Sequence, residues 1–318
     1  MKRVVVTASL PGDALDGLEG RARVRVLNSR GILSESTLQK ALRSADGAVT
    51  IPSDPVSERV LEGCPRLKVV ANCAVGTDNI DLEAARRLGI AVTNTPDVLN
   101  EATADLTWAL ILGVARRTAE GDRLLRRRRF RGWKPDFLLG VDLGGKTLGI
   151  VGMGRIGRAV ARRAAAFGMR VIYSQRTRLP VSVEDALGAR FFGLDDLLAR
   201  SDVVSLHCPL TDATRHLLDA GKLASMKKSA ILVNTGRGPL VDEDALVACL
   251  SRGHLFGAGL DVFEREPLLA PGLAALPNVL LLPHVGSAGA ETRAAMARLA
   301  VADCLAVLES REPAHRVV

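Results

Sequence analysis

A glycine-rich turn near the middle of the chain constrains the fold more than any other feature. It lies directly after the apolar segment LGIV and directly before the helix-forming segment AVARRAAAF. Its residues are Gly152, Met153, Gly154, Arg155, Ile156 and Gly157. In such a turn the first glycine permits the tight bend, the second lets the backbone approach a pyrophosphate, and the third lets the helix pack on the strand. The turn therefore predicts a dinucleotide-binding unit with phosphates at the helix N-terminus.

Strand and helix patterns alternate along all 318 residues, which favours parallel sheets covered by helices. Before the turn we expect strands at residues 3–9, 47–51, 67–71 and 90–93. After the segment that opens the second part, residues 146–151, we expect strands at 170–173, 203–207, 230–234, 257–261 and 279–282. The first part contains no glycine-rich phosphate loop. The fold class is therefore α/β, with two Rossmann-like or flavodoxin-like domains.

Two long helical patterns determine the predicted domain boundaries. Residues 100–117 are apolar nearly all round, which is typical of a helix buried on most sides, and we interpret them as a connector between two domains. Residues 290–308 form a second such connector. We predict a discontinuous substrate domain, residues 1–99 and 288–318, and a dinucleotide-binding domain, residues 100–287.

Composition and charge exclude several classes of protein. The net charge is +8 but aromatic residues make up only 3%, so stacking on nucleic-acid bases is not expected. We interpret the run of four arginines at 126–129 as a solvated helix end, and the positive charge as favouring anionic small molecules. The longest apolar stretch, 106–115, is about half a membrane span. The five scattered cysteines suit a reducing cytoplasm.

The segment VIYSQRTR, residues 171–178, bears on the choice of dinucleotide. An enzyme that binds NAD places an acid at this strand end to bond the ribose hydroxyls, and here Gln175 takes that place. Arg176 and Arg178 would attract a 2′-phosphate, and Ser174 and Thr177 would donate hydrogen bonds to it. The segment predicts NADPH (NADP). The alternative is that both arginines are ordinary surface charges and NADH is used as well.

Three further segments each follow a predicted strand, and their side chains should meet in one crevice beside the dinucleotide. They are NTGRG with Arg237, DVFEREP with a glutamate, and PHVGS with His284. An arginine fork binds a carboxylate and a keto oxygen, and a histidine gives that oxygen a proton as hydride reaches the carbon. A glutamate beside the histidine favours the imidazolium. The combination suits reduction of a 2-keto acid.

With these motifs the chain resembles the D-isomer-specific 2-hydroxyacid dehydrogenases over essentially its whole length. The matching segments are AVGTDNID (74–81), GMGRIG, HCPLT (207–211), NTGRG, GLDVFEREP and PHVGS. Within the family, TPDVLNEATADL, the segment 132–140 and VIYSQRTR look most like glyoxylate/hydroxypyruvate reductases that use NADPH.

The resemblance implies roles for individual residues. Arg237 would bind substrate, and Glu266 would pair with His284, the proton donor. Glu264 would then be a surface charge. Backbone N–H groups of Val75 and Gly76 would bind the substrate carboxylate. Besides the glycine turn and the VIYSQRTR residues, the implied dinucleotide contacts are His207 (through its backbone), Cys208, Pro209, Thr235, Gly236, Asp261 beside the nicotinamide amide, Val285 and Gly286.

The resemblance also implies an assembly. Members of the family form dimers through the coenzyme domain, and in similar reductases an aromatic side chain reaches the partner's active site. In this chain either Trp133 or Phe137 would do so.

The five histidines show no metal-ligand spacing, so we predict no metal.

The predicted function is therefore reduction of a small 2-keto acid, glyoxylate or hydroxypyruvate, to the D-2-hydroxy acid with NADPH. One alternative is an NAD-linked D-lactate or D-3-phosphoglycerate dehydrogenase. Another is a non-catalytic, dinucleotide-sensing protein like the co-repressors of this family. Turnover with each cofactor and keto acid distinguishes them.

Overall fold

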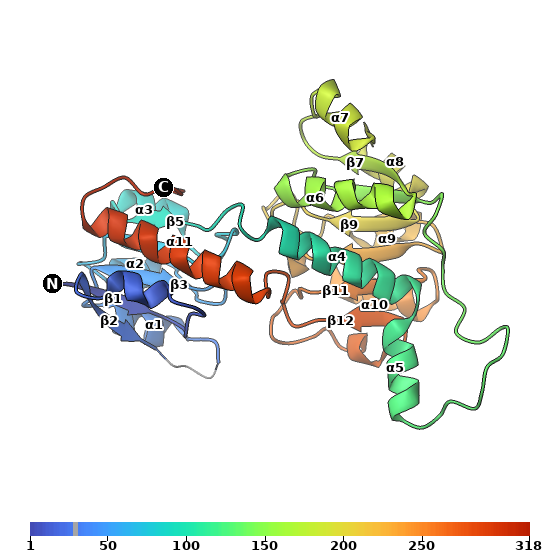
Figure 1. Cartoon of the computed structure of the whole chain (residues 1–318), viewed down its shortest axis with the longest axis horizontal. Coiled ribbons are helices and arrows are strands. Elements are labelled where there is room, and N and C mark those ends of the chain that lie inside the picture. The colour runs from blue at the N-terminus through green and yellow to red at the C-terminus, as the bar shows by residue number, and fades with distance from the viewer. Residues whose placement is uncertain (28–30) are drawn as a thin grey trace. The chain divides into compact units, whose positions relative to one another are not determined.

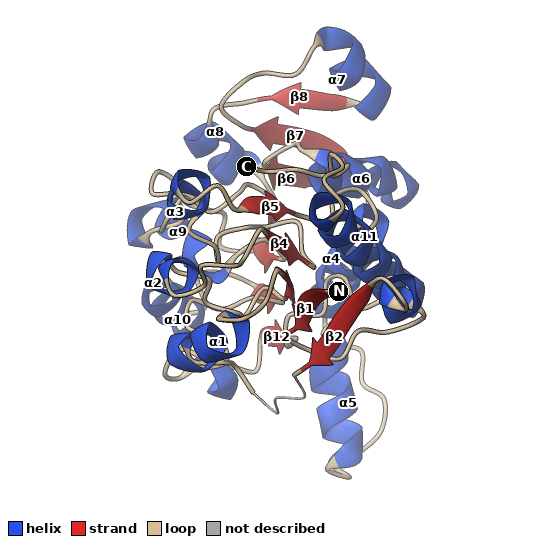
Figure 2. Cartoon of the chain, turned by 90° about the vertical axis from the view of Figure 1, so that its left-hand side faces the viewer, coloured by secondary structure: helices blue, strands red, loops and turns tan. Residues whose placement is uncertain are grey.

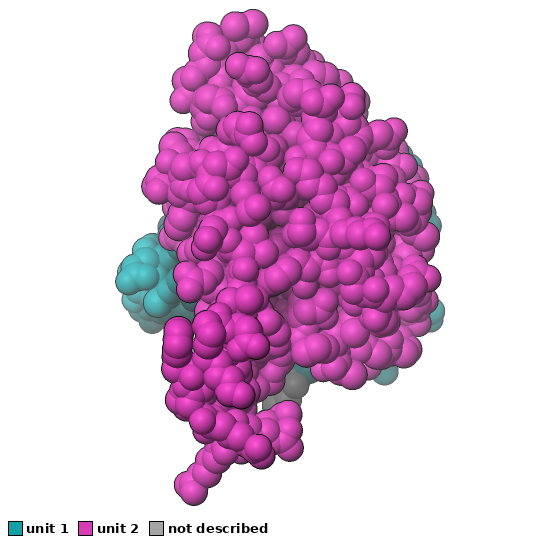
Figure 3. Space-filling model, turned by 90° about the vertical axis from the view of Figure 1, so that its right-hand side faces the viewer, with its two compact units in different colours: residues 1–99, 287–318 teal, residues 100–286 magenta. Residues whose placement is uncertain are grey.

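The computed structural model describes residues 1–27 and 31–318 and divides the chain into two compact units. Unit 1 comprises residues 1–99 and 287–318, and unit 2 comprises residues 100–286 (Figure 3). Unit 2 thus ends one residue earlier than the predicted domain boundary. Both units are built on parallel sheets, which confirms the α/β class expected from the sequence.

Unit 1 contains a five-stranded parallel sheet in the order β2-β1-β3-β4-β5. The strands are β1 (Lys2–Val6), β2 (Ala22–Val26), β3 (Gly47–Thr50), β4 (Val69–Asn72) and β5 (Ala91–Thr93). Figure 2 shows α1 (Glu35–Leu42), α2 (Glu58–Glu62) and α3 (Leu82–Arg87) along one face of this sheet, and α11 (Ala290–Leu308) along the other. The short 3₁₀ helix η1 (Ala14–Leu18) packs beside α11.

Successive apolar side chains point to opposite faces of this sheet, which explains why helices cover both faces. Val5 and Val70 belong to the core cluster that contains Leu38 and Leu42 of α1. Their neighbours in sequence, such as Val4, belong to the opposite cluster with the buried residues of α11. Strands that lie between two layers of helices are buried on both sides, as β3, β4 and β5 are at every position.

Unit 2 contains a seven-stranded parallel sheet in the order β12-β11-β10-β9-β6-β7-β8. Its strands are β6 (Thr147–Val151), β7 (Arg170–Ser174), β8 (Ala189–Phe191), β9 (Val203–Leu206), β10 (Ile231–Asn234), β11 (Gly257–Leu260) and β12 (Val279–Leu281). Its helices are α4 (Asn100–Ala115), α5 (Thr118–Arg126), α6 (Arg155–Ala164), α7 (Val181–Leu187), α8 (Leu194–Arg200), α9 (Ala220–Ser225) and α10 (Glu243–Ser251), with 3₁₀ turns η2 (Ala165–Phe167), η3 (Gly238–Leu240) and η4 (Leu273–Ala275). Figure 1 shows α4 and α6 side by side on one face of this sheet.

The strand order of unit 2 determines where a ligand would bind. From β6 the chain moves outward through β7 to β8, and it then returns to β9 on the other side of β6. In open α/β sheets a ligand binds outside the carboxyl ends of the strands at such a reversal. The loops that follow β6, β7, β9, β10, β11 and β12 all leave the sheet at this edge, because the strands are parallel.

Several predicted elements need correction. Strands β2 and β8, which are edge strands of their sheets, were not expected from the sequence. In β2 (ARVRV) alternate side chains are arginines in contact with solvent, so an apolar run is lacking. The predicted connector helices lie within single units: α4 packs on α6, β10 and β11, and α11 packs on β3 and β4. The interpretation of the four-arginine run as a solvated helix end, by contrast, is confirmed, because the run begins at the last residue of α5 and residues 126–129 are exposed.

One side chain offers a direct test of the core of unit 2. Trp108 is 4% exposed, stacks on Phe167 with ring centroids 4.2 Å apart, and donates from Nε1 to the carbonyl oxygen of Val160 at 3.1 Å. We expect Trp108→Ala to lower the free energy of unfolding by about 3–5 kcal/mol, since it removes a large buried ring. The matched control is Val181→Ala, because Val181 is 63% exposed. Urea unfolding of both variants is the measurement, and similar midpoints would contradict the packing described.

Candidate active site

The glycine turn between β6 and α6 has space where a dinucleotide would need it. Gly152 has φ +95°, and a Cβ there would lie 2.5 Å from the backbone nitrogen of Cys208. A Cβ on Gly157 would lie 2.2 Å from the carbonyl oxygen of Gly152, so these two positions admit only glycine. Gly154, by contrast, has no neighbouring atom of the described chain within 4 Å of its Cβ position. The turn is therefore tightly packed at Gly152 and Gly157 and open at Gly154.

The start of α6 adds donors to this open space. Arg155 and Ile156 form the first turn of the ten-residue helix, after the N-cap Gly154. The first N–H groups of a helix lack intrahelical partners and carry partial positive charge, so they bind phosphate. The turn and the helix start therefore fit the pyrophosphate of a nicotinamide dinucleotide.

The side chain of Gln175 connects the glycine turn to the end of β7. Its Oε1 accepts a hydrogen bond from the backbone nitrogen of Met153 at 3.0 Å, and its Nε2 donates to the carbonyl oxygen of Thr177 at 2.5 Å. The hydroxyl-bearing Ser174, at the last position of β7, is buried. Gln175 thus holds the two loops together rather than standing free as a ribose acceptor.

The two arginines of VIYSQRTR lie in different environments. Arg176 and Thr177 are exposed. Arg178, which was also expected to bind a 2′-phosphate, forms a two-pronged ion pair with Glu184 instead, at 3.0 and 2.7 Å. The Nε–Nη2 edge of the Arg178 guanidinium therefore already binds a carboxylate.

The HCPLT loop after β9 is firmly bound to the sheet. The backbone nitrogen of His207 donates to the carbonyl oxygen of Val151 at 2.7 Å, and its Nε2 lies 2.8 Å from the Ser205 hydroxyl. Burial lowers the pKa of His207 to about 4, so the ring is neutral at physiological pH. Burial also raises the pKa of the Cys208 thiol to about 11, and Pro209 is exposed. The ring of His207 is thus suited to a structural role.

The loop after β10 presents Arg237 and is held by a buried amide. Asn234 donates from Nδ2 to the carbonyl oxygen of Arg237 at 2.8 Å, and its Oδ1 accepts from the nitrogen of Gly236 at 3.0 Å. The hydroxyl of Thr235 lies 3.0 Å from that of Thr107 on α4. Asn234 had no role assigned from the sequence. Its place at the end of an apolar strand, where a buried amide needs partners, is the signal that identifies it.

Glu266 and His284 come together although 18 residues separate them in the sequence. Nδ1 of His284 lies 2.9 Å from Oε2 of Glu266, and Oε1 of Glu266 accepts from the backbone nitrogen of Phe263 at 3.0 Å. Burial by itself would raise the pKa of Glu266. The hydrogen bond from His284, together with the charges of His284 and Arg237, outweighs burial and holds that pKa below its ordinary value. Arg237, Glu266 and His284 therefore form one electrostatic group.

His284 has a backbone conformation that non-glycine residues rarely adopt, with φ +54°. Asp261 holds it there: its backbone oxygen accepts from the nitrogen of His284 at 2.8 Å. The Asp261 carboxylate accepts from the nitrogens of Val285 at 2.8 Å and Gly286 at 2.7 Å. Asp261 is 1% exposed, and burial raises its pKa despite these hydrogen bonds. Strained backbone of this kind persists where the surroundings fix it, and it is common at active sites.

Glu264 is not the surface charge expected from the sequence. Its carboxylate binds Nε2 of His216 and also accepts from the backbone nitrogen of Glu243 at 3.2 Å. Glu243 accepts in turn from the backbone nitrogen of Glu264 at 2.8 Å. This reciprocal pair fastens the loop of Glu264 and Glu266 to the start of α10. The correction leaves Glu266 as the glutamate that contacts His284.

The remaining assigned residues, Val75 and Gly76, belong to unit 1. Nδ2 of Asn94 donates to the carbonyl oxygen of Val75, and Nδ2 of Asn72 donates to that of Gly76, both at 2.9 Å. Asn72 is fully buried and also accepts from the hydroxyl of Thr50. Because both carbonyl groups are held by amides, the orientation of this loop is fixed within unit 1.

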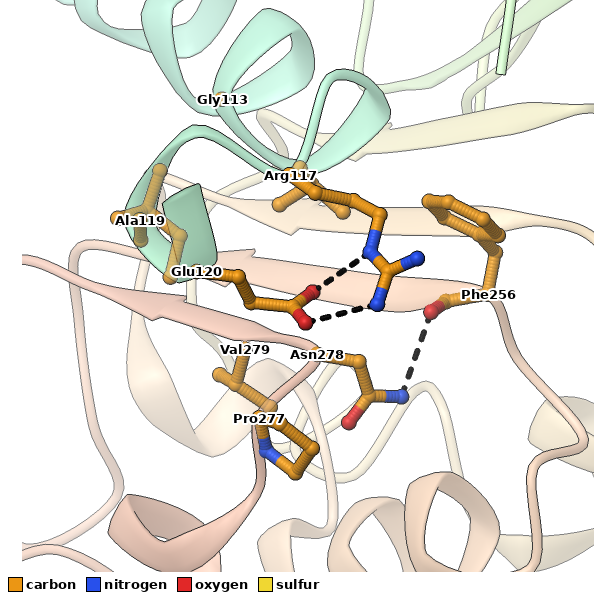
Figure 4. Close-up of a pocket in the computed structure, with 10 residues that line it drawn as sticks. Gly113, Arg117, Ala119, Glu120, Phe256, Pro277, Asn278 and Val279 are labelled. Atoms are coloured by element: carbon orange, nitrogen blue, oxygen red, sulfur yellow. Dashed lines mark hydrogen bonds and ion pairs between the residues drawn. The ribbon is translucent and has the colours of Figure 1, made fainter. Parts of the chain in front are cut away.

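A separate cavity of about 230 Å³ lies between the end of α4, the start of α5 and β12 (Figure 4). Arg117 crosses it and donates to Glu120 at 2.9 and 2.8 Å, and Asn278 donates to the carbonyl oxygen of Phe256. The cavity shares no lining residue with the loops of Arg237, Glu266 and His284. Its polar groups already bind one another, so it is not a centre of the chemistry.

Comparison with known proteins agrees with this geometry. A family model described as D-isomer specific 2-hydroxyacid dehydrogenase, NAD binding domain, matches residues 108–286. A glyoxylate reductase of Aeropyrum pernix is 49% identical over 320 residues, which cover 99% of this chain and 95% of the relative. The chain belongs to the D-isomer specific 2-hydroxyacid dehydrogenase family. It is an NAD(P)-dependent 2-hydroxyacid dehydrogenase.

Two solved structures show how far the likeness in fold extends. A crystal structure of a Thermus thermophilus protein superposes with a TM-score of 0.93 at 53% identity, and covers 99% of this chain and 100% of its own. An NADPH-dependent glyoxylate/hydroxypyruvate reductase from Sinorhizobium meliloti, in complex with NADP and malonate, gives a TM-score of 0.88 at 34% identity, over 100% of this chain and 97% of its own. Within residues 1–27 and 31–318, no helix of this chain is long and apolar enough to cross a membrane.

The close approach of two loops at this site provides a test of its geometry. A Cβ on Gly238 would lie 1.9 Å from the backbone carbon of Phe263, so the loop of Arg237 touches the loop of Glu266 with no room for a methyl group. We expect Gly238→Ala to lower the melting temperature by several degrees and to reduce turnover at least tenfold. Gly144→Ala is the control, because a Cβ there meets no described atom within 4 Å. Equal melting temperatures and turnover in the two variants would contradict the contact.

Proposed function

We propose that this dehydrogenase reduces a small 2-keto acid, glyoxylate or hydroxypyruvate, to the D-2-hydroxy acid with NADPH. The observation that carries the proposal is the 2.9 Å contact between His284 and Glu266, with the charge of Arg237 acting on the same carboxylate. An acid-base pair and a fork donor at the carboxyl edge of a sheet that also carries a dinucleotide turn match the needs of this reduction.

The proposed mechanism assigns one task to each side chain. The bound dinucleotide supplies a hydride to the keto carbon. Arg237 binds the substrate carboxylate and keto oxygen with its fork and stabilises the negative charge that develops on that oxygen. His284 donates the proton from Nε2, since its Nδ1 is bonded to Glu266. Glu266 orients the ring through its 2.9 Å contact with Nδ1.

The substrate class follows from the same groups and from the relatives. A 2-keto acid presents a carboxylate and an adjacent carbonyl, which the Arg237 fork and the backbone of Val75 and Gly76 would bind. The Aeropyrum relative is named for glyoxylate, and the Sinorhizobium enzyme for both glyoxylate and hydroxypyruvate. Small substrates of this kind are the ones we propose. The alternative is an NAD-linked D-lactate or D-3-phosphoglycerate dehydrogenase. Turnover with a panel of these acids and both dinucleotides distinguishes the two.

The proposed dinucleotide contacts combine the glycine turn with the residues around it. Gly152, Gly154, Gly157 and the start of α6 would hold the pyrophosphate, with the HCPLT loop behind them. Thr235, Gly236, Asp261, Val285 and Gly286 would lie along the nicotinamide half. The exposed Arg176, with Thr177, would bind the 2′-phosphate and so favour NADPH over NADH.

We also propose a cytoplasmic homodimer. All five cysteines are free thiols, as a reducing compartment requires. Figure 1 shows α5 and the following loop projecting from the body of unit 2. This projection carries the exposed Trp133 and the less exposed Phe137, whose ring lies 6.0 Å from that of Phe130. Either side chain would reach a partner subunit.

The proton-donor role of His284 gives the most direct test by mutation. We expect His284→Ala to lower kcat by roughly two to four decades, the usual contribution of general acid catalysis. Dinucleotide affinity, measured by calorimetry, should stay within about twofold, because the proposed phosphate contacts lie elsewhere. Near-normal turnover in this variant would remove His284 from the mechanism.

The fork of Arg237 gives a second test. Arg237→Lys keeps the positive charge but loses the planar pair of donors, so we expect the KM for the keto acid to rise at least tenfold. Exposed Arg190 on β8 provides the matched control, Arg190→Lys, which should leave all kinetic constants unchanged. If KM and kcat are the same in both variants, Arg237 does not bind substrate.

The lowered pKa of Glu266 predicts how stability depends on pH. A carboxyl group whose pKa is depressed by folding stabilises the protein above its ordinary pKa of 4.5, and this stabilisation is lost as pH falls through the lower folded value. We therefore expect Glu266→Gln to melt below the wild type at pH 7, with the gap closing as the pH falls below 4.5. The control is Glu291→Gln, an exposed change on α11. A gap that stays constant with pH would mean that the charge of Glu266 has no part in the pair.

A further inference from the structure

A buried network holds the turn between β7 and α7, residues 175–180. Tyr173 is fully buried, and its hydroxyl donates to Oε1 of Glu184 at 2.7 Å. The same hydroxyl accepts from the backbone nitrogen of Leu179 at 2.8 Å. Glu184 is 5% exposed and comes from α7. The turn is thereby joined at one end to the sheet and at the other to the helix that follows it.

Arg178 completes the network. Its Nε donates to Oε1 of Glu184 and its Nη2 donates to Oε2, so both carboxylate oxygens are bound by one guanidinium. Such planar, two-pronged pairs fix the orientation of both side chains. The hydrogen bonds from Arg178 and Tyr173 also hold the pKa of Glu184 below its ordinary value, which keeps it charged. The Nε–Nη2 edge of Arg178, bound in this way, is not available as a fork for a phosphate.

Arg176 lies between two fixed points of the same turn. On one side, Gln175 is bonded to Met153 of the glycine turn and to the carbonyl oxygen of Thr177. On the other side, Arg178 is bonded to Glu184. Arg176 itself is exposed, and no hydrogen bond or ion pair of its side chain occurs within residues 1–27 and 31–318. The backbone of the turn is fixed while this one guanidinium stays available.

We propose that Arg178 is a positioning residue, which with Glu184 and Tyr173 fixes the turn, and that Arg176 alone supplies the guanidinium for the 2′-phosphate of NADPH. This inference rests on the NADPH preference proposed above and identifies which residues produce it. It also explains why an acid so close to the cofactor segment does not repel a phosphate: the charge of Glu184 is neutralised by Arg178 at 2.7 Å.

The first experiment is a double-mutant cycle on binding, measured by calorimetry with NADP⁺ and NAD⁺. Arg176→Ala should weaken NADP⁺ about 10- to 100-fold and leave NAD⁺ within about twofold, since a charge-assisted contact to phosphate is lost. If Arg178 acts only through Arg176, adding Arg178→Ala to Arg176→Ala should weaken NADP⁺ less than about twofold further. A further tenfold loss in the double variant would show direct contact and overturn the positioning role.

The second experiment measures thermal unfolding without cofactor. Arg178→Ala and Glu184→Gln should each lower the melting temperature, and the double variant should melt no lower than the less stable single variant, because both changes break the same pair. Arg190→Ala is the control for loss of an exposed arginine nearby in sequence. Unchanged melting of Arg178→Ala, or strictly additive losses, would overturn the network.

The two failures can be told apart. If the wild type binds NAD⁺ more tightly than NADP⁺ and Arg176→Ala changes neither affinity, the NADPH preference and the role of Arg176 are both wrong. If NADP⁺ is preferred but Arg178→Ala weakens NADP⁺ binding equally with and without Arg176, the cofactor preference stands. Only the positioning role of Arg178 is then overturned.

Discussion

The buried carboxylate of Asp261 is the interaction on which the candidate site depends. It lies at the end of β11 and accepts hydrogen bonds from two consecutive backbone nitrogens, those of Val285 and Gly286. Together with the bond from the nitrogen of His284 to the backbone oxygen of Asp261, these contacts hold His284 at φ +54°. Such a conformation costs on the order of 1–3 kcal/mol, so it requires surroundings that fix it. These hydrogen bonds hold His284 in the conformation in which its ring contacts Glu266.

Close backbone packing brings the arginine to the same place. The loop after β10 touches the loop after β11 at Gly238, where a Cβ would overlap Phe263. Asn234 holds the first loop from within, and the reciprocal bonds of Glu243 and Glu264 hold the second from outside. Arg237, Glu266 and His284 are therefore presented by closely packed loops on one sheet edge. Preorganised groups of this kind stabilise charge without reorganising as it develops.

How much the sequence could predict depended on how local each signal was. The glycine turn, the apolar strands and the segment 290–308 carry their own periodicity, and the structure has elements at those places. The edge strands β2 and β8 have exposed arginines between their apolar residues, so neither contains an apolar run that would predict a strand. The ion pairs of Arg178 and Glu264 were missed because their partners, Glu184 and His216, are brought to them only when the chain has folded. The sequence alone does not show whether a charged side chain is exposed or paired, because its partner can come from a distant part of the chain.

We propose that the enzyme reduces a 2-keto acid with one stereochemical outcome and that Arg237, Glu266 and His284 form its active site. The most direct measurement incubates the purified protein with NADPH and hydroxypyruvate and determines the configuration of the glycerate formed by chiral chromatography. The account predicts stoichiometric oxidation of NADPH and D-glycerate as the product, and loss of both in His284→Ala. Formation of L-glycerate, or no consumption of either dinucleotide with any small 2-keto acid, would contradict it.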